Sequence, residues 1–259
     1  MLAILRQGKA DFGVVSVKAE FEAEGTRSDE FLRLLDIARR ADLGVALKIG
    51  GCEAMRDLIE ARNYGVDTIV APMVESPYAL SKYVAAKNKV FSTQEQEDVT
   101  FLFNVETRGT VDHLAELGEV AAAGHTGFVF GRVDFAGSMG HTRDFVNSAE
   151  MLAHLRHVAQ VAHDRNLELV VGGGVSPASV EILRAVRAIR LDRFETRKVI
   201  FDAAILDAGK AAEAMELAIE FELLWLKNKR DFYRSIAEED ASRIAMMEAR
   251  AASRLKEPA

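Results

Sequence analysis

The chain has 259 residues, 49% of them hydrophobic, with 33 Lys and Arg against 40 Asp and Glu. A chain of this length and balance can bury a full hydrophobic core, which excludes disordered, collagen-like and disulfide-scaffold proteins. The formal net charge of −7 provides no basic field for a phosphate backbone, so nucleic acid is not an expected partner.

Cysteine content and apolar stretches bear on the location of the protein. The one cysteine, Cys52, cannot form an internal disulfide, and residues 1–12 lack the apolar core of a secretory signal. The most apolar helical stretch, residues 211–226, contains four glutamates, whereas a membrane span needs about 18 uncharged residues. We therefore expect a cytoplasmic protein that does not cross a membrane.

Short apolar runs alternate with helix-patterned segments from residue 14 to residue 226, which is typical of β/α units. Strands are predicted at 14–20, 45–49, 68–74, 100–105, 127–130, 168–171 and 194–201. Helices are predicted from residue 28 onward and at 53–63, 77–86, 110–122, 145–165 and 177–187. The predicted strands are apolar on both faces, as the buried strands of a parallel sheet are.

A parallel sheet of this size is either a closed (β/α)₈ TIM-type barrel or an open doubly wound sheet. An open nucleotide-binding sheet normally has a glycine-rich turn after its first strand, and no such turn follows the strand at 14–20. The pattern therefore favours a barrel domain over residues 1–206. Seven strands are predicted, and either residues 1–5 supply a stub of the eighth or the first β/α unit is shortened.

Residues 207–259 are rich in Ala, Glu and Arg and carry no strand signal. We expect two consecutive C-terminal helices, separated by a charged stretch at 227–231, that cover the barrel or a neighbouring subunit. The first helix has one apolar stripe: Met215, Ala218, Phe221, Leu224 and Trp225. The second helix has another: Phe232, Ile236, Ile244 and Met247. The second stripe exceeds what one barrel needs, which favours a homo-oligomer contact over a solvated appendage.

The active site of a β/α barrel lies where the strands end and the loops begin. Polar residues at the predicted strand ends are therefore candidates for the site, and they are Lys18, Glu20, Glu22, Lys48, Glu75, Glu106, Arg108, Arg132, Asp134, Arg193, Glu195 and Arg197. Arg193, Glu195 and Arg197 alternate along the last predicted strand, so we expect them to form an inward network of ion pairs.

Two carboxylates stand out among these candidates. Glu106 ends the fourth predicted strand and Asp134 follows the fifth, and the ends of neighbouring parallel strands lie side by side. Two converging carboxylates make an oxygen-rich site that suits Mg²⁺ or Mn²⁺. The alternative is that each carboxylate is neutralised by a salt bridge to Arg108 or Arg132.

The sequence around these carboxylates resembles a known family. Residues 105–109 (V-E-T-R-G) and 131–140 (G-R-V-D-F-A-G-S-M-G) resemble the I-E-T and G-P-S-D-L-S-x-S-L-G signature of the HpcH/HpaI aldolase and citrate lyase β-subunit family. Residues 72–76 (P-M-V-E-S) are similar to the P-M-V-E-T strand end of that family. The resemblance covers about residues 14–205.

The resemblance implies a metal-dependent barrel that acts on a small 2-oxo acid such as pyruvate. Glu106 and Asp134 match the residues that hold Mg²⁺ or Mn²⁺ in the family, where the metal stabilises the enolate of the substrate. The backbone N–H groups of Gly131, Arg132 and Val133 match the turn that binds the substrate carboxylate.

The chain departs from the family pattern at two positions. The family's Asp-x-Glu-His motif aligns with residues 18–21 (K-A-E-F), so its base-forming His and Asp pair is missing. The family's substrate-binding arginine aligns with Lys48, which can bind an anionic oxygen as a point charge. Lys18 and Lys48 are thus the candidate substrate-binding cations. Glu20 is the candidate base, or it forms a structural pair with one of these lysines, and His141 is a second candidate base.

The function predicted from these residues is that of a class II aldolase-like carbon–carbon lyase, with Lys48 and Glu20 as catalytic residues. A citrate-synthase-like or acyl-CoA lyase-like condensation and a non-catalytic metal-binding scaffold are the alternatives, and a base at the barrel mouth would favour an enzyme. A lysine Schiff base is a further alternative. It is disfavoured because the carboxylates near Lys18 and Lys48 in the sequence raise a lysine pKa.

Overall fold

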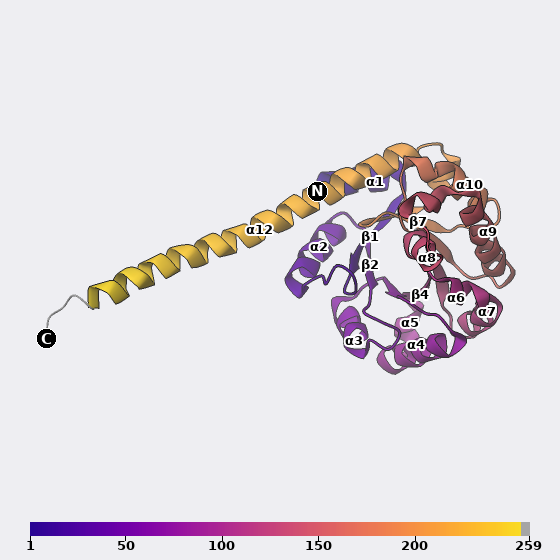
Figure 1. Cartoon of the computed structure of the whole chain (residues 1–259), viewed down its shortest axis with the longest axis horizontal. Coiled ribbons are helices and arrows are strands. Elements are labelled where there is room, and N and C mark those ends of the chain that lie inside the picture. The colour runs from indigo at the N-terminus through magenta and orange to yellow at the C-terminus, as the bar shows by residue number, and fades with distance from the viewer. Residues whose placement is uncertain (255–259) are drawn as a thin grey trace.

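The computed structural model describes residues 1–254, so residues 255–259 of the predicted C-terminal extension lie outside the described part. Its eight strands form a closed barrel in the order β1 to β8, ringed by helices (Figure 1). This confirms the predicted barrel and excludes the open sheet. The strands are β1 (Val14–Glu20), β2 (Gly44–Lys48), β3 (Thr68–Ala71), β4 (Thr100–Val105), β5 (Gly127–Gly131), β6 (Leu169–Gly172), β7 (Arg193–Glu195) and β8 (Val199–Asp202).

Helices connect the successive parallel strands, and the structure divides the helices predicted at 110–122, 145–165 and 177–187 into two pieces each. The α-helices are α1 (Leu2–Phe12), α2 (Ser28–Arg40), α3 (Met55–Tyr64), α4 (Pro77–Val90), α5 (Thr93–Glu97), α6 (Arg108–Asp112), α7 (Leu114–Ala123), α8 (Arg132–Ser138), α9 (Ala149–Asp164), α10 (Val180–Arg187), α11 (Ala204–Asp207) and α12 (Ala211–Arg254). Two short 3-10 helices are η1 (Arg143–Asn147) and η2 (Pro177–Ser179).

The last two strands correct the sequence prediction. The segment 194–201, predicted as one strand, forms β7 and β8, and β8 runs antiparallel to both β7 and β1. The polar run at 195–198 turns the chain, and Thr196 closes the turn by donating its N–H to the carbonyl of Val199 at 2.9 Å. The eighth strand therefore comes from this hairpin, and the sheet is not parallel throughout.

Residues 1–5 do not form a strand. They belong to α1, which packs its buried Leu5 and Gly8 toward β1 and α12. A Cβ atom on Gly8 would lie 2.7 Å from Val14 and 3.2 Å from Leu217, so this glycine permits the close contact. The predicted strand stub is wrong because the apolar residues of this segment serve helix packing.

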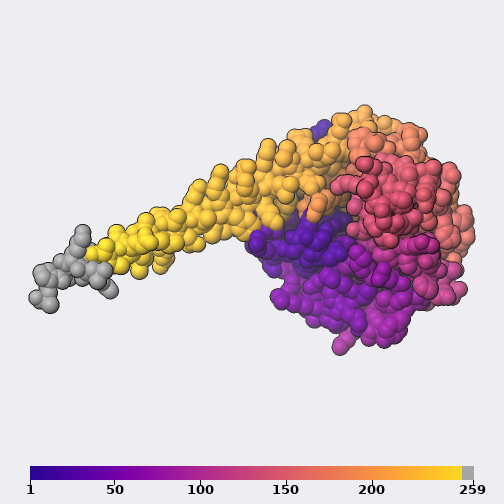
Figure 2. All heavy atoms as spheres, viewed as in Figure 1, coloured from indigo at the N-terminus to yellow at the C-terminus, as the bar shows by residue number. Residues whose placement is uncertain are grey.

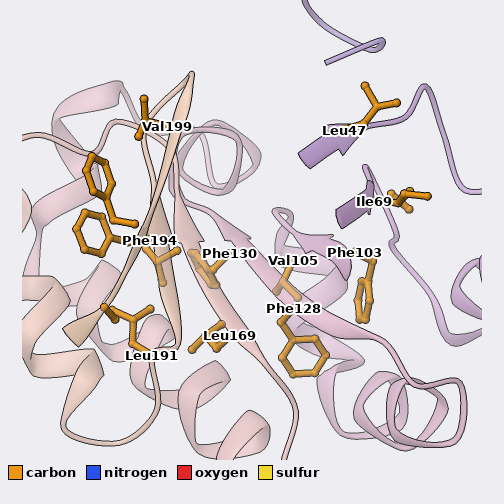
Figure 3. Close-up of a cluster of buried hydrophobic side chains, with 14 of the residues drawn as sticks. Leu47, Ile69, Phe103, Val105, Phe128, Phe130, Leu169, Leu191, Phe194 and Val199 are labelled. Carbon is orange, nitrogen blue, oxygen red and sulfur yellow. The ribbon is translucent and has the colours of Figure 1, made fainter. Parts of the chain in front are cut away.

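Side chains alternate between the outside and the inside of the barrel along each strand. The outward residues pack beneath the helices and include Phe103 and Phe128 (Figure 3), whose rings meet edge to face at 5.2 Å. Inside the barrel, a separate apolar layer consists of Val70, Leu102, Val129 and Val170. Polar residues follow this layer toward the strand ends, so the apolar layer forms the floor beneath the site.

Helix α12 is one continuous helix of 44 residues, about 66 Å long at 1.5 Å per residue. The two predicted helices are therefore one, because the charged stretch at 227–231 contains no glycine or proline that would end a helix. Its first half buries Phe221 and Trp225 against the barrel. Residues 234–252 are all exposed, and Figure 2 shows this half projecting from the body.

The barrel holds α12 as far as residue 233 through contacts with α2. Lys229 forms an ion pair with Glu30 at 3.0 Å, and the Tyr233 hydroxyl donates to the same carboxylate at 2.7 Å. The guanidinium of Arg33 lies 3.9 Å from the centre of the Phe232 ring. Of the second predicted apolar stripe, Phe232 thus packs within the chain, whereas the remaining residues are exposed: Ile236, Ile244 and Met247.

No helix in the part of the chain that the structure describes combines the length and the apolar character that a membrane span requires.

Candidate active site

The barrel interior opens into a cavity of about 650 Å³ at the end where the parallel strands finish. Val129 from the inner apolar layer lines its floor. The titratable side chains that line it are Lys18, Glu20, Glu22, Lys48, Glu106, Asp134, Arg143, Glu195, Arg197 and Glu222. The strand ends therefore bring together every residue that the sequence assigned to catalysis or metal binding.

Glu106 follows β4 and is only 1% exposed. Its carboxylate accepts a hydrogen bond from the backbone N–H of Met73 at 2.9 Å and another from the Asn104 amide at 2.5 Å. Burial raises the pKa of Glu106, and the nearby charge of Asp134 raises it further, whereas Lys48 opposes the shift. Glu106 and Asp134 thus follow neighbouring parallel strands, β4 and β5, as the sequence predicted.

Asp134 lies in the first turn of α8, directly after β5, and its side chain is exposed to the cavity. Neither Asp134 nor Glu106 pairs with Arg108 or Arg132 among the described residues, so the salt-bridge alternative is wrong. Gly131 gives Glu106 its place, because a Cβ atom on Gly131 would lie 2.9 Å from the Glu106 carboxylate.

Lys48 ends β2 and reaches across to both sides of the cavity. Its ammonium lies 2.8 Å from Glu22 and 3.7 Å from Glu106. Burial lowers the pKa of Lys48, but the charges of Glu106 and Glu22 outweigh burial and raise it overall. Lys48 is therefore a cation beside the Glu106 carboxylate, and its predicted binding of a substrate anion stays a prediction.

A second group of charges surrounds Lys18, whose ammonium lies 2.5 Å from Glu195 and 3.1 Å from Glu20. Gly172 makes room for Glu195, since a Cβ atom there would lie 2.9 Å from the Glu195 carboxylate. Burial lowers the pKa of Lys18, but the two carboxylates raise it well above its ordinary value. A Schiff base on Lys18 is therefore disfavoured, because the amine stays protonated.

Glu20 faces the cavity but is already partnered. Burial raises its pKa, and the adjacent Lys18 outweighs this, so the pKa of Glu20 lies below its ordinary value. A lowered pKa makes Glu20 a weak base. The structure contains the ion pair of Glu20 with Lys18, which was the alternative role for Glu20 in the sequence analysis. His141 is exposed and stacks on Phe145 with ring centres 4.0 Å apart.

The predicted ion-pair network of the last strand is divided between two ends of the barrel. Glu195 points inward to Lys18, as expected. Arg193 pairs with Glu168, and Arg197 pairs with Glu24 at 2.9 Å. Arg193 begins β7, Glu195 ends it and Arg197 lies in the turn before β8, so the three side chains pair with three different partners and form no common network.

Arg132, expected to bind substrate through its backbone, buries its guanidinium outside the cavity lining. Nε and the two Nη atoms donate to the Gly172 carbonyl, the Val146 carbonyl, the Asn147 side chain and the Ser179 hydroxyl at 3.0–3.3 Å. Burial lowers the pKa of Arg132 to about 10. Its charged group therefore joins loops together and is not available to a substrate anion.

The turn that contains Gly131, Arg132 and Val133 lies against Gly173. A Cβ atom on Gly173 would lie 2.7 Å from the backbone nitrogens of both Arg132 and Val133. Because glycine has no such atom, space remains beside these two amides. The predicted role of this turn in binding a carboxylate stays a prediction.

Sequence reasoning missed three residues of the cavity. Asn104 holds Glu106 from two residues upstream on the same inward face of β4, and its Oδ1 atom is buried without a hydrogen-bond partner. The alternation of β4 could have identified it. Arg143 and Glu222 lie on η1 and α12, and no signal in the sequence places either helix beside the strand ends.

The donor set at Glu106 and Asp134 fits a hard divalent cation. Mg²⁺ is commonly held by one or two carboxylates, with water and substrate oxygens as its other ligands. The unpartnered Oδ1 of Asn104 adds an oxygen acceptor beside Glu106. No group of three or more His, Cys, Asp or Glu side chains placed to hold a metal ion occurs within residues 1–254.

Comparison with known proteins agrees with this barrel and with the motifs at its strand ends. A model of the HpcH/HpaI aldolase/citrate lyase family matches residues 29–178. This match spans more than half of the chain, and the chain belongs to the HpcH/HpaI aldolase/citrate lyase family. No curated protein sequence matches the chain.

Solved structures share the fold at low sequence identity. An HpcH/HpaI aldolase from Desulfitobacterium hafniense aligns with a TM-score of 0.60 and 14% identity over 81% of this chain and 85% of that one. An HpcH/HpaI aldolase/citrate lyase family protein from Burkholderia cenocepacia aligns with a TM-score of 0.60 and 15% identity, over 85% of this chain and 90% of that one. A variant of the citrate synthase SbnG aligns with a TM-score of 0.56 and 13% identity, over 86% of this chain and 89% of that one. These structural alignments establish a common barrel. The sequence identities are too low to assign the reaction, which is argued from the site.

Proposed function

We propose that the protein is a divalent-metal-dependent carbon–carbon lyase that acts through the enolate of pyruvate or a related 2-oxo acid in the cytoplasm. The observation that carries this proposal is the pair of Glu106 and Asp134, which lie after neighbouring strands and line one cavity. Family membership supports the reaction class. The proposal covers both cleavage and the reverse, synthetic direction.

Glu106 and Asp134 would hold Mg²⁺ or Mn²⁺. A divalent cation bound there supplies positive charge to the oxygen on which an enolate develops, without proton exchange by a protein group. Asn104 keeps Glu106 in place through the hydrogen bond to its carboxylate. Gly131 keeps the space next to that carboxylate free of a side chain.

Lys48 gives this site a fixed positive charge on the substrate side. Burial lowers the pKa of Lys48, but the charges of Glu106 and Glu22 outweigh burial and raise the pKa overall, so the ammonium remains charged when a substrate enters. An ammonium 3.7 Å from the Glu106 carboxylate can donate to a substrate carboxylate or keto oxygen bound beside that residue. We assign Lys48 to substrate binding and Glu20 to holding the protonated Lys18.

The proton-transfer group is the point at which an enzyme and a scaffold differ. The lowered pKa of Glu20 and the surface position of His141 weaken both candidate bases, so the scaffold and the citrate-synthase-like or acyl-CoA lyase-like condensation remain the competing hypotheses. A base supplied by the substrate or by a bound water would be consistent with the lyase.

Exchange of the C3 protons of pyruvate tests the proposal without knowledge of the second substrate. The protein is incubated with pyruvate and Mg²⁺ in D₂O, and loss of the methyl proton signal is followed by NMR. We expect exchange that stops on addition of EDTA and is absent from Asp134→Asn. Metal binding without any exchange would favour the scaffold.

We also propose that a second copy of the chain covers α12. Exposed apolar residues lie along one side of it in two places, Ile219, Leu223 and Leu226 in its first half and Ile244 and Met247 in its second. In a two-fold dimer the same stripe of each copy can face its counterpart, so one contact buries both stripes. Ile219 also lines the cavity, which places the proposed contact next to the cavity mouth.

Truncation after Ser235 tests this assembly, because it removes the exposed half of α12 and keeps the contacts of Lys229 and Tyr233 with α2. We expect a smaller assembly by light scattering, and the same result for Ile244→Glu. Ser242→Glu, an exposed change on another side of the helix, is the control. An unchanged mass for both the truncated chain and Ile244→Glu would exclude this contact.

A further inference from the structure

One side of α12 presents a row of residues at alternating steps of four and three, which is the spacing of the contact line between two paired helices. We call this row the α12 seam, and its members are Ile219, Leu223, Leu226, Arg230, Tyr233, Ala237, Asp240, Ile244, Met247 and Ala251. Apolar side chains occupy both ends of the seam, and one cation and one anion lie between them.

The α12 seam faces away from the barrel to which the helix is bound. Phe221 and Trp225, which pack on the barrel, are at most 3% exposed, whereas Leu223, between them in the sequence, is 49% exposed. The seam residues are all exposed except Tyr233, which is half-buried against α2. A second helix can therefore lie along the seam without displacing the contacts of α12 with its own barrel.

The two charged residues of the seam have little compensation within the chain. Asp240 forms no ion pair with any residue in the described range 1–254. Arg230 pairs with Asp231 at 2.9 Å, and Asp231 also has Arg234 at 3.3 Å. Arg230 can thus turn to another carboxylate while Asp231 keeps a cation.

The seam is complementary to itself when it is read in the opposite direction. Arg230 and Asp240 lie five residues before and after Ser235, and Leu226 and Ile244 lie nine residues before and after it. In an antiparallel pair of helices with its two-fold axis at Ser235, residues equally far from the axis on either side face each other. Each copy then places Arg230 opposite an aspartate and Leu226 opposite an isoleucine.

Other arrangements of the same two helices lack this match. A parallel pair places Arg230 against Arg230 and Asp240 against Asp240, and such like charges are repulsive. An antiparallel pair shifted by seven residues places Arg230 opposite Met247 in one direction and Asp240 opposite Leu223 in the other. Either shift desolvates a charge against an apolar side chain.

We propose that two copies of α12 form an antiparallel coiled coil centred on Ser235, in which Arg230 of each copy pairs with Asp240 of the other. The inference rests on the proposed contact of α12 with a second copy of the chain and adds its direction and register. It also gives the projecting half of the helix a purpose, because that half carries the residues that cover Leu223 and Leu226 of the other copy.

Charge reversal tests the register, with the dissociation constant of the dimer measured by sedimentation of the full chain. Arg230→Glu and Asp240→Arg should each raise the Kd at least about tenfold, because each creates two like-charge pairs per dimer. The double variant, Arg230→Glu with Asp240→Arg, should return the Kd to near the wild-type value. Glu239→Arg is the matched control, since Glu239 is exposed beside Asp240 but lies off the seam, and it should leave the Kd unchanged.

Disulfide formation tests the direction in a Cys52→Ser background. Leu226→Cys and Ile244→Cys, mixed as two single variants, should cross-link to each other. Neither should cross-link alone, because two copies of the same residue lie about 27 Å apart along the antiparallel pair.

The outcomes separate the register from the assembly on which it rests. A wild type that stays monomeric would overturn both. A dimer whose Kd is unchanged in Arg230→Glu and Asp240→Arg, or whose cysteine variants cross-link singly and not in the mixture, would overturn the antiparallel register and leave the contact with a second copy standing. The lyase proposal is measured separately, by proton exchange.

Discussion

The cavity contains two groups of carboxylates that are built alike and neutralised differently. The β4 group consists of Glu106, Asp134 and Lys48, and the β1 group consists of Glu20, Glu195 and Lys18. In the β1 group the ammonium lies within 3.1 Å of both carboxylates. In the β4 group Lys48 lies 3.7 Å from Glu106, and Asp134 has no ion pair among the described residues. The lysine of the β4 group therefore lies farther from its buried carboxylate than the lysine of the β1 group lies from either of its own.

The β4 group and the β1 group each include a carboxylate that packs against a glycine of a neighbouring strand. Gly131 and Gly172 are partners in the register of β5 and β6. Each leaves space for one carboxylate, Gly131 for Glu106 and Gly172 for Glu195. The barrel therefore accommodates both acids in the same way, and the two groups differ in how closely a lysine approaches the carboxylates.

The largest expected effect is on metal binding by the β4 group. Glu106→Gln and Asp134→Asn should each abolish Mg²⁺ binding in calorimetry, because each removes an anionic oxygen ligand. Glu20→Gln is the matched control from the β1 group and should bind Mg²⁺ with wild-type affinity. Unchanged Mg²⁺ affinity in both β4 variants, or loss of Mg²⁺ binding in Glu20→Gln, would contradict the assignment of the metal site to the β4 group.

The second expected effect is on stability and concerns the β1 group. Lys18→Met leaves Glu20 and Glu195 buried without a cation, and breaking a buried pair in this way costs about 3–5 kcal/mol. The free energy of unfolding, measured in urea, should fall by that amount. Adding Glu195→Gln to Lys18→Met should recover part of it. A double variant that is no more stable than Lys18→Met would show that unpaired buried charge does not cause the loss of stability.

The smallest expected effect is on the affinity for oxalate, a mimic of the pyruvate enolate. Lys48→Ala should weaken oxalate binding at least about tenfold in saturating Mg²⁺, because one charge-assisted contact of about 1.5–3 kcal/mol is lost. Lys48→Arg should retain part of the affinity, since it keeps the charge. Equal oxalate affinity in the wild type and Lys48→Ala would place this lysine outside the substrate site.

The sequence predicts the barrel and the β4 group because both depend on local patterns. Short apolar strands with polar ends are visible along the chain, and Glu106 and Asp134 lie one and three residues after the strands β4 and β5. The position of Lys48 at the end of β2 follows in the same way. A residue next to a strand end has little freedom of direction, so its place in the cavity can be inferred before the structure is known.

The remaining features depend on contacts between distant segments. The hairpin of β7 and β8 is set by closure of the barrel against β1, which no local pattern encodes. The buried position of the Arg132 guanidinium cannot be predicted from the sequence, because it binds Val146 and Ser179, which are 14 and 47 residues away. Arg143 lines the cavity from η1, which Arg132 binds at Val146 and Asn147, so its position follows from tertiary contacts.

The closure of the barrel has a consequence for synthesis on the ribosome. Every pair of neighbouring strands is consecutive in sequence except β1 and β8, whose partners include Val17 and Val199. At roughly 5–20 residues per second, β8 emerges about 10–40 s after β1. During that interval the nascent sheet exposes a free edge at β1, and free edges pair readily with other chains. The time to the last strand therefore sets how long this edge stays unpaired during synthesis.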